Sequence, residues 1–207
     1  MDKSAIILAG GFSSRLGKDK ALLQLASKPL IRHVLDSISN VVEEKLVIVS
    51  SKTQVENYSK IIGSKATICM DKGDVQSPLA GVLAGFEKAC GEYSLVLPCD
   101  APFLNKDILL LLFDLCIGKA AAIPRWPNRY MEPLHAVYRT ESALEATRNA
   151  LAEGRLTMQS MVDKLRGVRY ISTLVLQQLD PELRTFSNIN TFLDLKKAEN
   201  LLKRINK

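Results

Sequence analysis

Residues 5–20 read AIILAGGFSSRLGKDK, so a short apolar run leads directly into a glycine-rich, cationic segment. The run at residues 5–8 predicts a buried strand. Gly10 and Gly11 let the backbone after it turn tightly and approach another group with no side chain between them. Successive backbone N–H groups in such a turn point at an anion. The stretch therefore predicts an anion-binding turn at the end of a first strand.

Three cations in this segment favour phosphate as the anion. Arg15 offers a planar fork that matches phosphate oxygens, and Lys18 and Lys20 offer point charges. The alternative is a surface loop whose charges favour solubility. A strand, paired glycines and three cations within a few residues favour the phosphates of a nucleotide.

The spacing of the glycines excludes the two commonest phosphate motifs. The dinucleotide fingerprint G-x-G-x-x-G does not fit Gly10, Gly11 and Gly17. A P-loop needs four residues between its glycines and Ser or Thr after its lysine. Here five residues separate Gly11 from Gly17, and Asp19 follows Lys18.

Composition predicts one globular domain, residues 1–207, with 47% hydrophobic and 24% charged residues. The net charge of +6 suits a site for several phosphates, and no zinc spacing or basic-aromatic stretch supports nucleic-acid binding. The four cysteines form no C-x-x-C pair and have apolar neighbours, so we expect buried thiols in a reducing compartment. No apolar stretch reaches bilayer length. We expect a cytoplasmic protein that binds neither nucleic acid nor membrane.

Short apolar runs alternate with helical patterns along the chain. This alternation predicts a three-layer α/β/α fold with a mostly parallel, open, Rossmann-like sheet. The expected strands are residues 5–8, 46–49, 66–70, 94–97, 120–123, 134–138 and 168–171, and the expected helices are residues 29–38, 54–62, 79–90, 108–116, 140–152, 157–165 and 191–204.

Polar residues follow the predicted strands at the edge where such sheets bind ligands. Ser50, Asp71, Asp100 and Arg125 follow the second to fifth strands. Asp100 stands between two prolines and offers a rigid carboxylate, a hard ligand suited to Mg²⁺ beside nucleotide phosphates. The alternative is that Asp100 caps the turn that follows.

Other residues are candidates for the sugar, base or acceptor. Asp71 can accept from a sugar hydroxyl or a base amine, or be an ordinary loop carboxylate. Residues 77–81, Ser-Pro-Leu-Ala-Gly, predict a helix start whose small residues let a flat base lie close. Asn188 and Asn190 share one side of an extended segment, although capping alone would explain Asn190.

Taken together, these stretches resemble the molybdenum cofactor guanylyltransferases, within the nucleotidyltransferase superfamily. The front of the chain matches Leu-Ala-Gly-Gly-x-x-x-Arg-Leu/Met-Gly-x-x-Lys, and the end matches Asn-Ile-Asn-Thr-x-x-Asp-Leu. The intervening matches are at residues 28–30, 78–81, 98–102 and 154–155. Ser77 departs from the usual glycine, and Phe192-Leu193 from the common Pro-Glu.

The resemblance implies transfer of GMP from GTP to the terminal phosphate of the molybdenum-pterin cofactor, releasing pyrophosphate. It implies GTP and that cofactor as partners, with delivery or acceptor proteins as further candidates, and Mg²⁺ held by Asp100. The implied catalytic residues are Arg15, Lys20 and Asp100. The implied binding residues are Leu8, Ala9, Gly10, Gly11, Lys20, Asp71, Leu79, Gly81, Asn188 and Asn190.

We expect residues 1–105 to bind the nucleotide and residues 106–207 to bind the acceptor. Arg125, Trp126, Arg129 and Arg155 are candidate acceptor contacts, as are the two asparagines. His135, in the predicted strand at residues 134–138, is a further candidate acceptor contact, which we disfavour.

Three other functions remain open from the sequence. The first is a cytidylyltransferase for the same cofactor, and the second is a guanylyltransferase for another small phosphorylated acceptor. A non-catalytic nucleotide-binding module is the third alternative, which the presence of Arg15, Lys20 and Asp100 disfavours.

Overall fold

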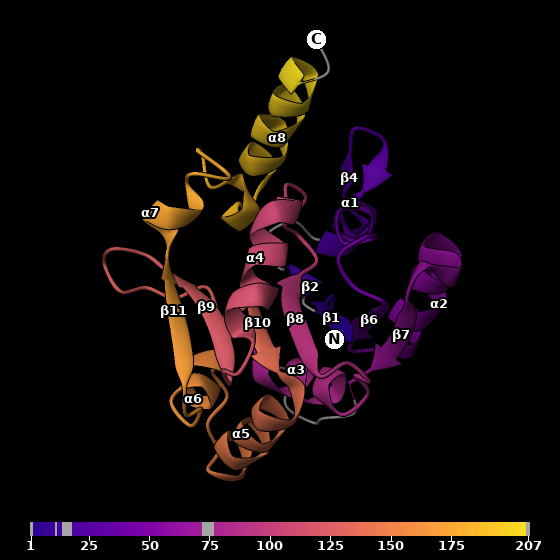
Figure 1. Cartoon of the computed structure of the whole chain (residues 1–207). Coiled ribbons are helices and arrows are strands. Elements are labelled where there is room, and N and C mark those ends of the chain that lie inside the picture. The colour runs from indigo at the N-terminus through magenta and orange to yellow at the C-terminus, as the bar shows by residue number, and fades with distance from the viewer. Residues whose placement is uncertain (1, 11, 14–17, 72–76, 206–207) are drawn as a thin grey trace.

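A seven-stranded sheet crosses the centre of the computed structural model, which describes residues 2–10, 12–13, 18–71 and 77–205 (Figure 1). The strands lie in the order β11-β9-β10-β8-β1-β6-β7. Their bounds are β1 Lys3–Leu8, β6 Glu44–Val49, β7 Thr67–Met70, β8 Tyr93–Pro98, β9 Ala121–Arg125, β10 Ala136–Arg139 and β11 Val168–Ser172.

The sheet is mostly parallel, as predicted. Strand β1 pairs in parallel with β6 and β8, β6 with β7, and β11 with β9. Strand β10 is the exception, because it runs antiparallel to both β8 and β9. Only residues 126–135 join β9 to β10. A parallel crossover needs a dozen residues or more, so this connection turns back at the same edge.

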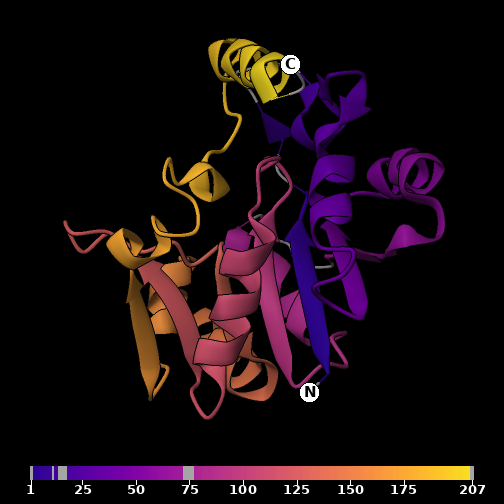
Figure 2. The ribbon, with the colours of Figure 1, turned by 45° about the horizontal axis from the view of Figure 1, so that its top comes forward.

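Helices cover both faces of the sheet, which confirms the three-layer architecture (Figure 2). Alternation along β1 sends Ala5 and Ile7 to one core and Ile6 to the other. The first core is covered by α1 Leu30–Ser37, α2 Lys52–Ile62 and α4 Lys106–Cys116, and the second by α3 Pro78–Phe86, α5 Thr140–Ala152 and α6 Met158–Val162.

A third, smaller core joins the end of the chain to its beginning. Helix α8 Phe192–Ile205 packs against the hairpin of β4 Gln24–Leu25 and β5 Lys28–Pro29, beside which it lies in Figure 1. No turn signal marks this hairpin in the sequence, because Ala26 and Ser27 rather than glycine occupy its positive-φ positions. The remaining short elements are β2 Phe12–Ser13, β3 Lys18–Asp19, η1 Lys20–Leu22, η2 Gly63–Lys65, α7 Thr173–Leu176 and η3 Arg184–Phe186.

Two expectations about the end of α3 were wrong. The helix ends at Phe86 rather than at residue 90, because tertiary hydrogen bonds redirect the chain. The Cys90 backbone N–H donates to Glu44 Oε2 at 2.8 Å, and that of Gly91 donates to Ser4 Oγ at 2.9 Å. Cys90 is therefore exposed, whereas Cys99 and Cys116 are buried as expected.

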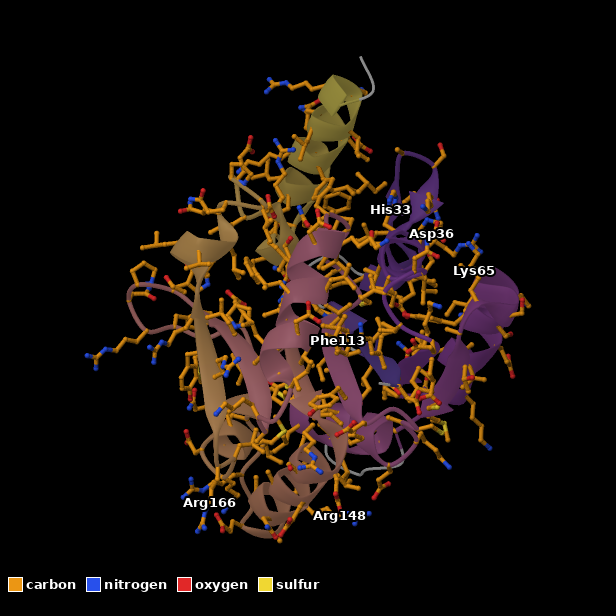
Figure 3. The ribbon with its side chains drawn as sticks, in the orientation of Figure 1. His33, Asp36, Lys65, Phe113, Arg148 and Arg166 are labelled. Atoms are coloured by element: carbon orange, nitrogen blue, oxygen red, sulfur yellow. The ribbon has the colours of Figure 1, made fainter. Side chains whose placement is uncertain are left out.

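Histidine 33 has a packing role in α1. It is half-buried, and its Nε2 lies 2.9 Å from the Leu25 carbonyl oxygen, so it ties α1 to the β4–β5 hairpin (His33 is labelled in Figure 3). Within the described ranges, no helix combines the length and apolar character needed to cross a membrane.

Candidate active site

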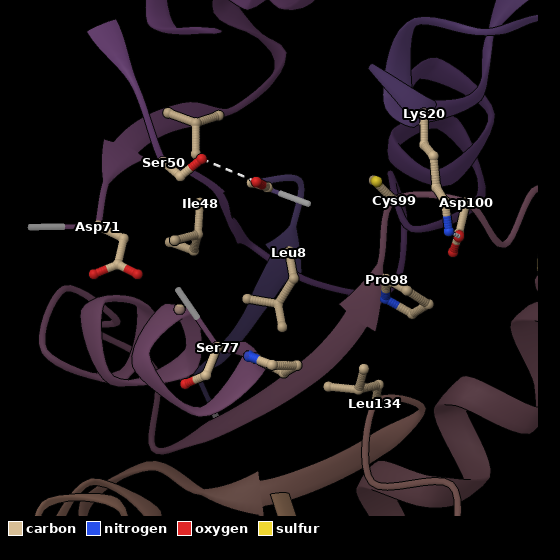
Figure 4. Close-up of a pocket in the computed structure, with 14 residues that line it drawn as sticks. Leu8, Lys20, Ile48, Ser50, Asp71, Ser77, Pro98, Cys99, Asp100 and Leu134 are labelled. Atoms are coloured by element: carbon tan, nitrogen blue, oxygen red, sulfur yellow. Dashed lines mark hydrogen bonds and ion pairs between the residues drawn. The ribbon is translucent and has the colours of Figure 1, made fainter. Parts of the chain in front are cut away.

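A pocket of about 450 Å³ opens at the carboxyl edge of the parallel strands (Figure 4). This is the edge where open α/β sheets bind ligands, and the volume suits a small molecule. The walls come from the ends of β1, β6, β7 and β8, the start of α3 and the loop before β10. The lining residues are Leu8, Gly10, Lys20, Ile48, Val49, Ser50, Asp71, Ser77, Pro78, Gly81, Pro98, Cys99, Asp100 and Leu134.

A polar triad of Lys20, Asp100 and Asn190 stands at one end of this pocket. Lys20 Nζ lies 3.3 Å from Asp100 Oδ2 and donates to Asn190 Oδ1 at 2.6 Å. Asp100 follows β8 and is only 7% exposed. Its carbonyl oxygen accepts from the Ile189 N–H at 2.9 Å, which fixes the C-terminal segment beside the strand. Residues from three distant parts of the chain therefore meet at one point.

Burial makes the Asp100 carboxylate responsive to nearby cations. Desolvation raises the pKa of Asp100, and the charge and hydrogen bond of Lys20 act in the opposite direction without cancelling it. A second cation beside this carboxylate would lower its pKa further. The site is thus suited to a ligand that arrives with a metal ion. The described residues contain no cluster of three or more His, Cys, Asp and Glu side chains able to hold a metal alone.

The other end of the pocket is formed near the end of β7 and the start of α3. Figure 4 shows Asp71 and Ser77 on this side, across the pocket from Lys20 and Asp100. Ser77 caps α3 by accepting from the Ala80 N–H at 3.1 Å. At Gly81 an added Cβ would lie 3.1 Å from Leu8 Cδ2, so the small residue lets α3 approach β1. The serine at position 77 leaves this helix start intact.

The structure gathers six of the expected site residues around one pocket. Leu8, Gly10, Lys20, Asp71, Gly81 and Asp100 line it, and Asn190 reaches it through Lys20.

Two expected binding residues instead have their side chains in the core. Ala9 is 1% exposed and Leu79 is 0% exposed, because each packs between the sheet and its covering helices. Neither lines the pocket, so a role for Ala9 or Leu79 in binding would have to come from the backbone, and it stays a prediction. Gly11 and Arg15 lie outside the described residues.

Asn188 is separated from the main pocket. It and Asn190 are both exposed and flank the buried Ile189. Asn190 contacts Lys20, whereas Asn188 lines a second groove of about 340 Å³ together with Arg184 and Lys197.

The expected acceptor cations do not line the pocket. Arg125 lies over the Tyr170 ring at 4.5 Å, and Arg155 forms an exposed ion pair with Glu153 at 3.5 Å. Arg129 has a φ of 69° within the β9–β10 loop, and no lining residue of the pocket comes from its neighbourhood except Leu134.

Trp126 and His135 form an aromatic cluster with Phe186. The Trp126 and His135 rings lie 6.0 Å and 5.4 Å from the Phe186 ring. Trp126 Nε1 donates to Glu132 Oε1 at 2.7 Å. His135 is 1% exposed, both its ring nitrogens are buried without a hydrogen bond, and burial lowers its pKa to about 4. His135 therefore packs in the core and does not line the pocket.

Leu134 was missed by the sequence reasoning. It reaches the pocket because β10 runs antiparallel and so begins at the edge where its neighbours end. Apolar periodicity carries no information on strand direction, so no signal in this segment marked it.

Comparison with known proteins shows the family of this chain. Residues 5–168 match the model of the MobA-like NTP transferase domain. The chain belongs to this family.

Two relatives with similar sequences support this assignment. The probable molybdenum cofactor guanylyltransferase of Methanosarcina mazei is 36% identical over 93% of this chain and 88% of its own length. The molybdenum cofactor guanylyltransferase of Desulfosudis oleivorans is 32% identical over 97% of this chain and 96% of its own length.

A solved structure of a similar protein supports the same grouping. The molybdopterin-guanine dinucleotide biosynthesis protein A of Archaeoglobus fulgidus superposes with a TM-score of 0.83 at 29% identity. The superposition covers 98% of this chain and 99% of that one. It therefore includes the C-terminal segment that carries Asn190, which lies beyond the 5–168 family match.

Proposed function

We propose that this protein transfers GMP from GTP to the terminal phosphate of the molybdenum-pterin cofactor, releasing pyrophosphate. The observation that carries the proposal is Lys20, which bridges the buried Asp100 and Asn190 at one end of the pocket. The family and the names of the relatives in Methanosarcina mazei and Desulfosudis oleivorans support the same reaction.

The chemistry needs alignment and charge neutralisation more than acid-base catalysis. The attacking phosphate is already an anion, so no strong base has to remove a proton from it. Lys20 supplies a positive charge for the triphosphate and the departing pyrophosphate, with Arg15 as its expected partner. Fixed charges of this kind stabilise the transition state without reorganising during the reaction.

Asp100 is the residue we assign to Mg²⁺. Its carboxylate is a hard ligand. Burial raises the pKa of Asp100 more than Lys20 lowers it, and a metal cation would stabilise the charged carboxylate. When bound, the ion would neutralise phosphate charge. Lys20 and Asn190 would keep the carboxylate in place.

We assign the base and sugar to the opposite end of the pocket. Asp71 offers an acceptor there, and Leu8 and Gly81 form the neighbouring wall of the pocket. The backbone at Gly10 lies between the two ends. Buried polar groups that a base leaves unpaired would provide the selectivity for guanine.

In this scheme residues 1–105 mainly hold the nucleotide and residues 106–207 the acceptor. Asn190 and the groove beyond it, with Asn188, Arg184 and Lys197, face the acceptor side. We also place the reaction in the cytoplasm, and the four free cysteines agree with a reducing compartment.

The test is pyrophosphate release from GTP, CTP and ATP, each with and without the molybdenum-pterin cofactor. We expect release only with GTP and the cofactor together. Faster release with CTP would make the protein a cytidylyltransferase. Pyrophosphate release with another phosphorylated acceptor, but not with the pterin, would make the protein a guanylyltransferase for that acceptor. GTP binding without pyrophosphate release would make it a non-catalytic nucleotide-binding module.

A further inference from the structure

Helix α2 contacts the chain on both sides of the glycine-rich segment. Tyr58 is 0% exposed, and its hydroxyl lies 2.7 Å from Asp19 Oδ1 and 3.1 Å from the Ala9 carbonyl oxygen. Ala9 comes just before the paired glycines, and Asp19 comes just before Lys20. One buried hydroxyl therefore lies between the two ends of this segment.

Gln54, one turn earlier on α2, reaches the same two ends. Its Nε2 donates to Asp19 Oδ2 at 3.0 Å and lies 3.4 Å from the Ala9 carbonyl oxygen. Its Oε1 accepts from the Ser50 backbone N–H at 2.9 Å. Ser50 Oγ in turn donates to the Gly10 carbonyl oxygen at 2.9 Å. Gln54 thus links Asp19 to pocket residues Ser50 and Gly10.

Packing alone does not require these polar atoms. A phenylalanine at position 58 would fill the same apolar space without a hydroxyl that needs a partner. Burial raises the pKa of Tyr58, so its hydroxyl stays protonated and can donate. Asp19 accepts from Tyr58, from Gln54 and from the Ala21 N–H at 3.2 Å. The network is satisfied by its own members.

We propose that Asp19, Gln54 and Tyr58 form a clamp that sets the position of Gly10 and Lys20 for the nucleotide. They are positioning residues, because none of the three lines the pocket. A group displaced by about 1 Å can lose roughly a hundredfold in rate, so an anchor behind the site has a large effect. The inference rests on the proposed function in taking GTP as the nucleotide.

The first test removes single hydroxyl groups from two buried tyrosines. Tyr58→Phe deletes the clamp contact and keeps the ring. Tyr93→Phe is the matched control, since the Tyr93 hydroxyl accepts from the Gly118 N–H at 3.2 Å outside the pocket. We expect the KM for GTP to rise about tenfold in Tyr58→Phe and to change less than twofold in Tyr93→Phe. Melting temperatures should fall by similar amounts in both.

The second test exchanges donor and acceptor between Asp19 and Gln54. Asp19→Asn alone places the new NH₂ group of residue 19 against the NH₂ group of Gln54. Gln54→Glu alone places two carboxylates against each other. The double variant restores one N–H···O bond, while position 19 still offers an oxygen to Tyr58. We expect kcat/KM for GTP in the double variant to exceed that of each single variant at least threefold.

Equal KM values for Tyr58→Phe and Tyr93→Phe would overturn the clamp, and so would a double variant no more active than the better of the two single variants. These results are distinct from failure of the proposed function. In that case the unaltered protein would release no pyrophosphate from GTP and the pterin cofactor, and binding of a fluorescent GTP analogue would then report on the clamp.

Discussion

Two polar sites of this protein differ in how fully their side chains are hydrogen-bonded. Around the pocket, Lys20 bonds to Asp100 and Asn190. Next to the pocket residue Leu134, His135 has two buried ring nitrogens and no hydrogen bond to either, and Glu132 Oε2 lies 3.9 Å from its Nδ1. Buried polar groups without partners reduce stability, whereas a satisfied network holds its members in one arrangement. Because Ser94 with Thr140 and Asp180 with Thr185 are also hydrogen-bonded in the core, His135 is an exception among the described buried side chains.

We expect the largest effect from removing the Asp100 carboxylate from the network of Lys20, Asp100 and Asn190. Asp100→Ala should lower kcat for GMP transfer roughly a thousandfold or more, since both the charge for Mg²⁺ and the partner of Lys20 are lost. Asp100→Asn keeps the shape without the charge and should be nearly as inactive. Circular dichroism should show an intact fold. Wild-type turnover in either variant with Mg²⁺ would exclude the assigned role.

Removing the cation from the same network should have the next largest effect. Lys20→Ala should lower kcat/KM for GTP by about 10²- to 10³-fold, or about 3–4 kcal/mol. Lys65→Ala is the control, because that lysine is 45% exposed and pairs with Asp36 away from the pocket. Steady-state kinetics of both variants provide the check. Equal kinetics would mean that Lys20 is an ordinary surface charge.

The His135 site can be examined through the pH dependence of the free energy of unfolding. Burial lowers the pKa of His135 from 6.5 to about 4, so the unfolded chain takes up the proton first. The stability that the neutral His135 ring contributes to the folded state is therefore fully present above about pH 6.5 and is lost as the pH falls towards 4. The loss is on the order of 3 kcal/mol.

His135→Phe should remove that part of the pH dependence. Urea unfolding of both proteins between pH 7 and 4 measures the difference, which also separates His135 from Glu132, whose pKa is raised by burial. Two parallel stability profiles would show that the His135 ring gains a partner in solution.

The smallest expected effect concerns the exposed ion pairs of Asp36 with Lys28 and Lys65. Burial raises the pKa of Asp36, but hydrogen bonds and charges from Lys28 and Lys65 outweigh it and lower the pKa to about 2. The stabilisation is therefore present above about pH 4 and lost as the pH falls through 2. Asp36 lies beside Lys65 in Figure 3 and its side chain is 37% exposed, so water screens the pair.

Asp36→Asn should cost less than about 1 kcal/mol at neutral pH, and added salt should reduce that difference. Thermal unfolding at low and high ionic strength is the measurement. A loss of several kcal/mol would show that exposure does not weaken this cluster as expected.

The sequence predicted the sheet and much of the site because both depend on local patterns. Apolar runs marked each strand, and polar residues after the strands marked the edge where Asp71 and Asp100 lie. What it could not predict depends on distant contacts. Leu134 enters the pocket through strand direction, and Lys20 meets Asn190 only because α8 packs on the β4–β5 hairpin.

The buried polar residues show the same limit. Tyr58 and Gln54 looked like ordinary residues of one helix, because their partner Asp19 lies more than thirty positions away. His135 showed no sign that it would lack a partner. Motifs locate groups that touch a ligand, whereas the groups behind them emerge only from the packed chain.

The central claim is that the pocket at the carboxyl edge of the strands holds GTP, with its phosphates at Lys20 and Asp100. A crystal structure with a non-hydrolysable GTP analogue and Mg²⁺ tests it most directly. The account predicts the triphosphate beside Lys20, the metal ion on Asp100 and the guanine near Asp71 and Gly81. A nucleotide bound instead in the groove lined by Arg184 and Lys197, with the edge pocket empty, would contradict it.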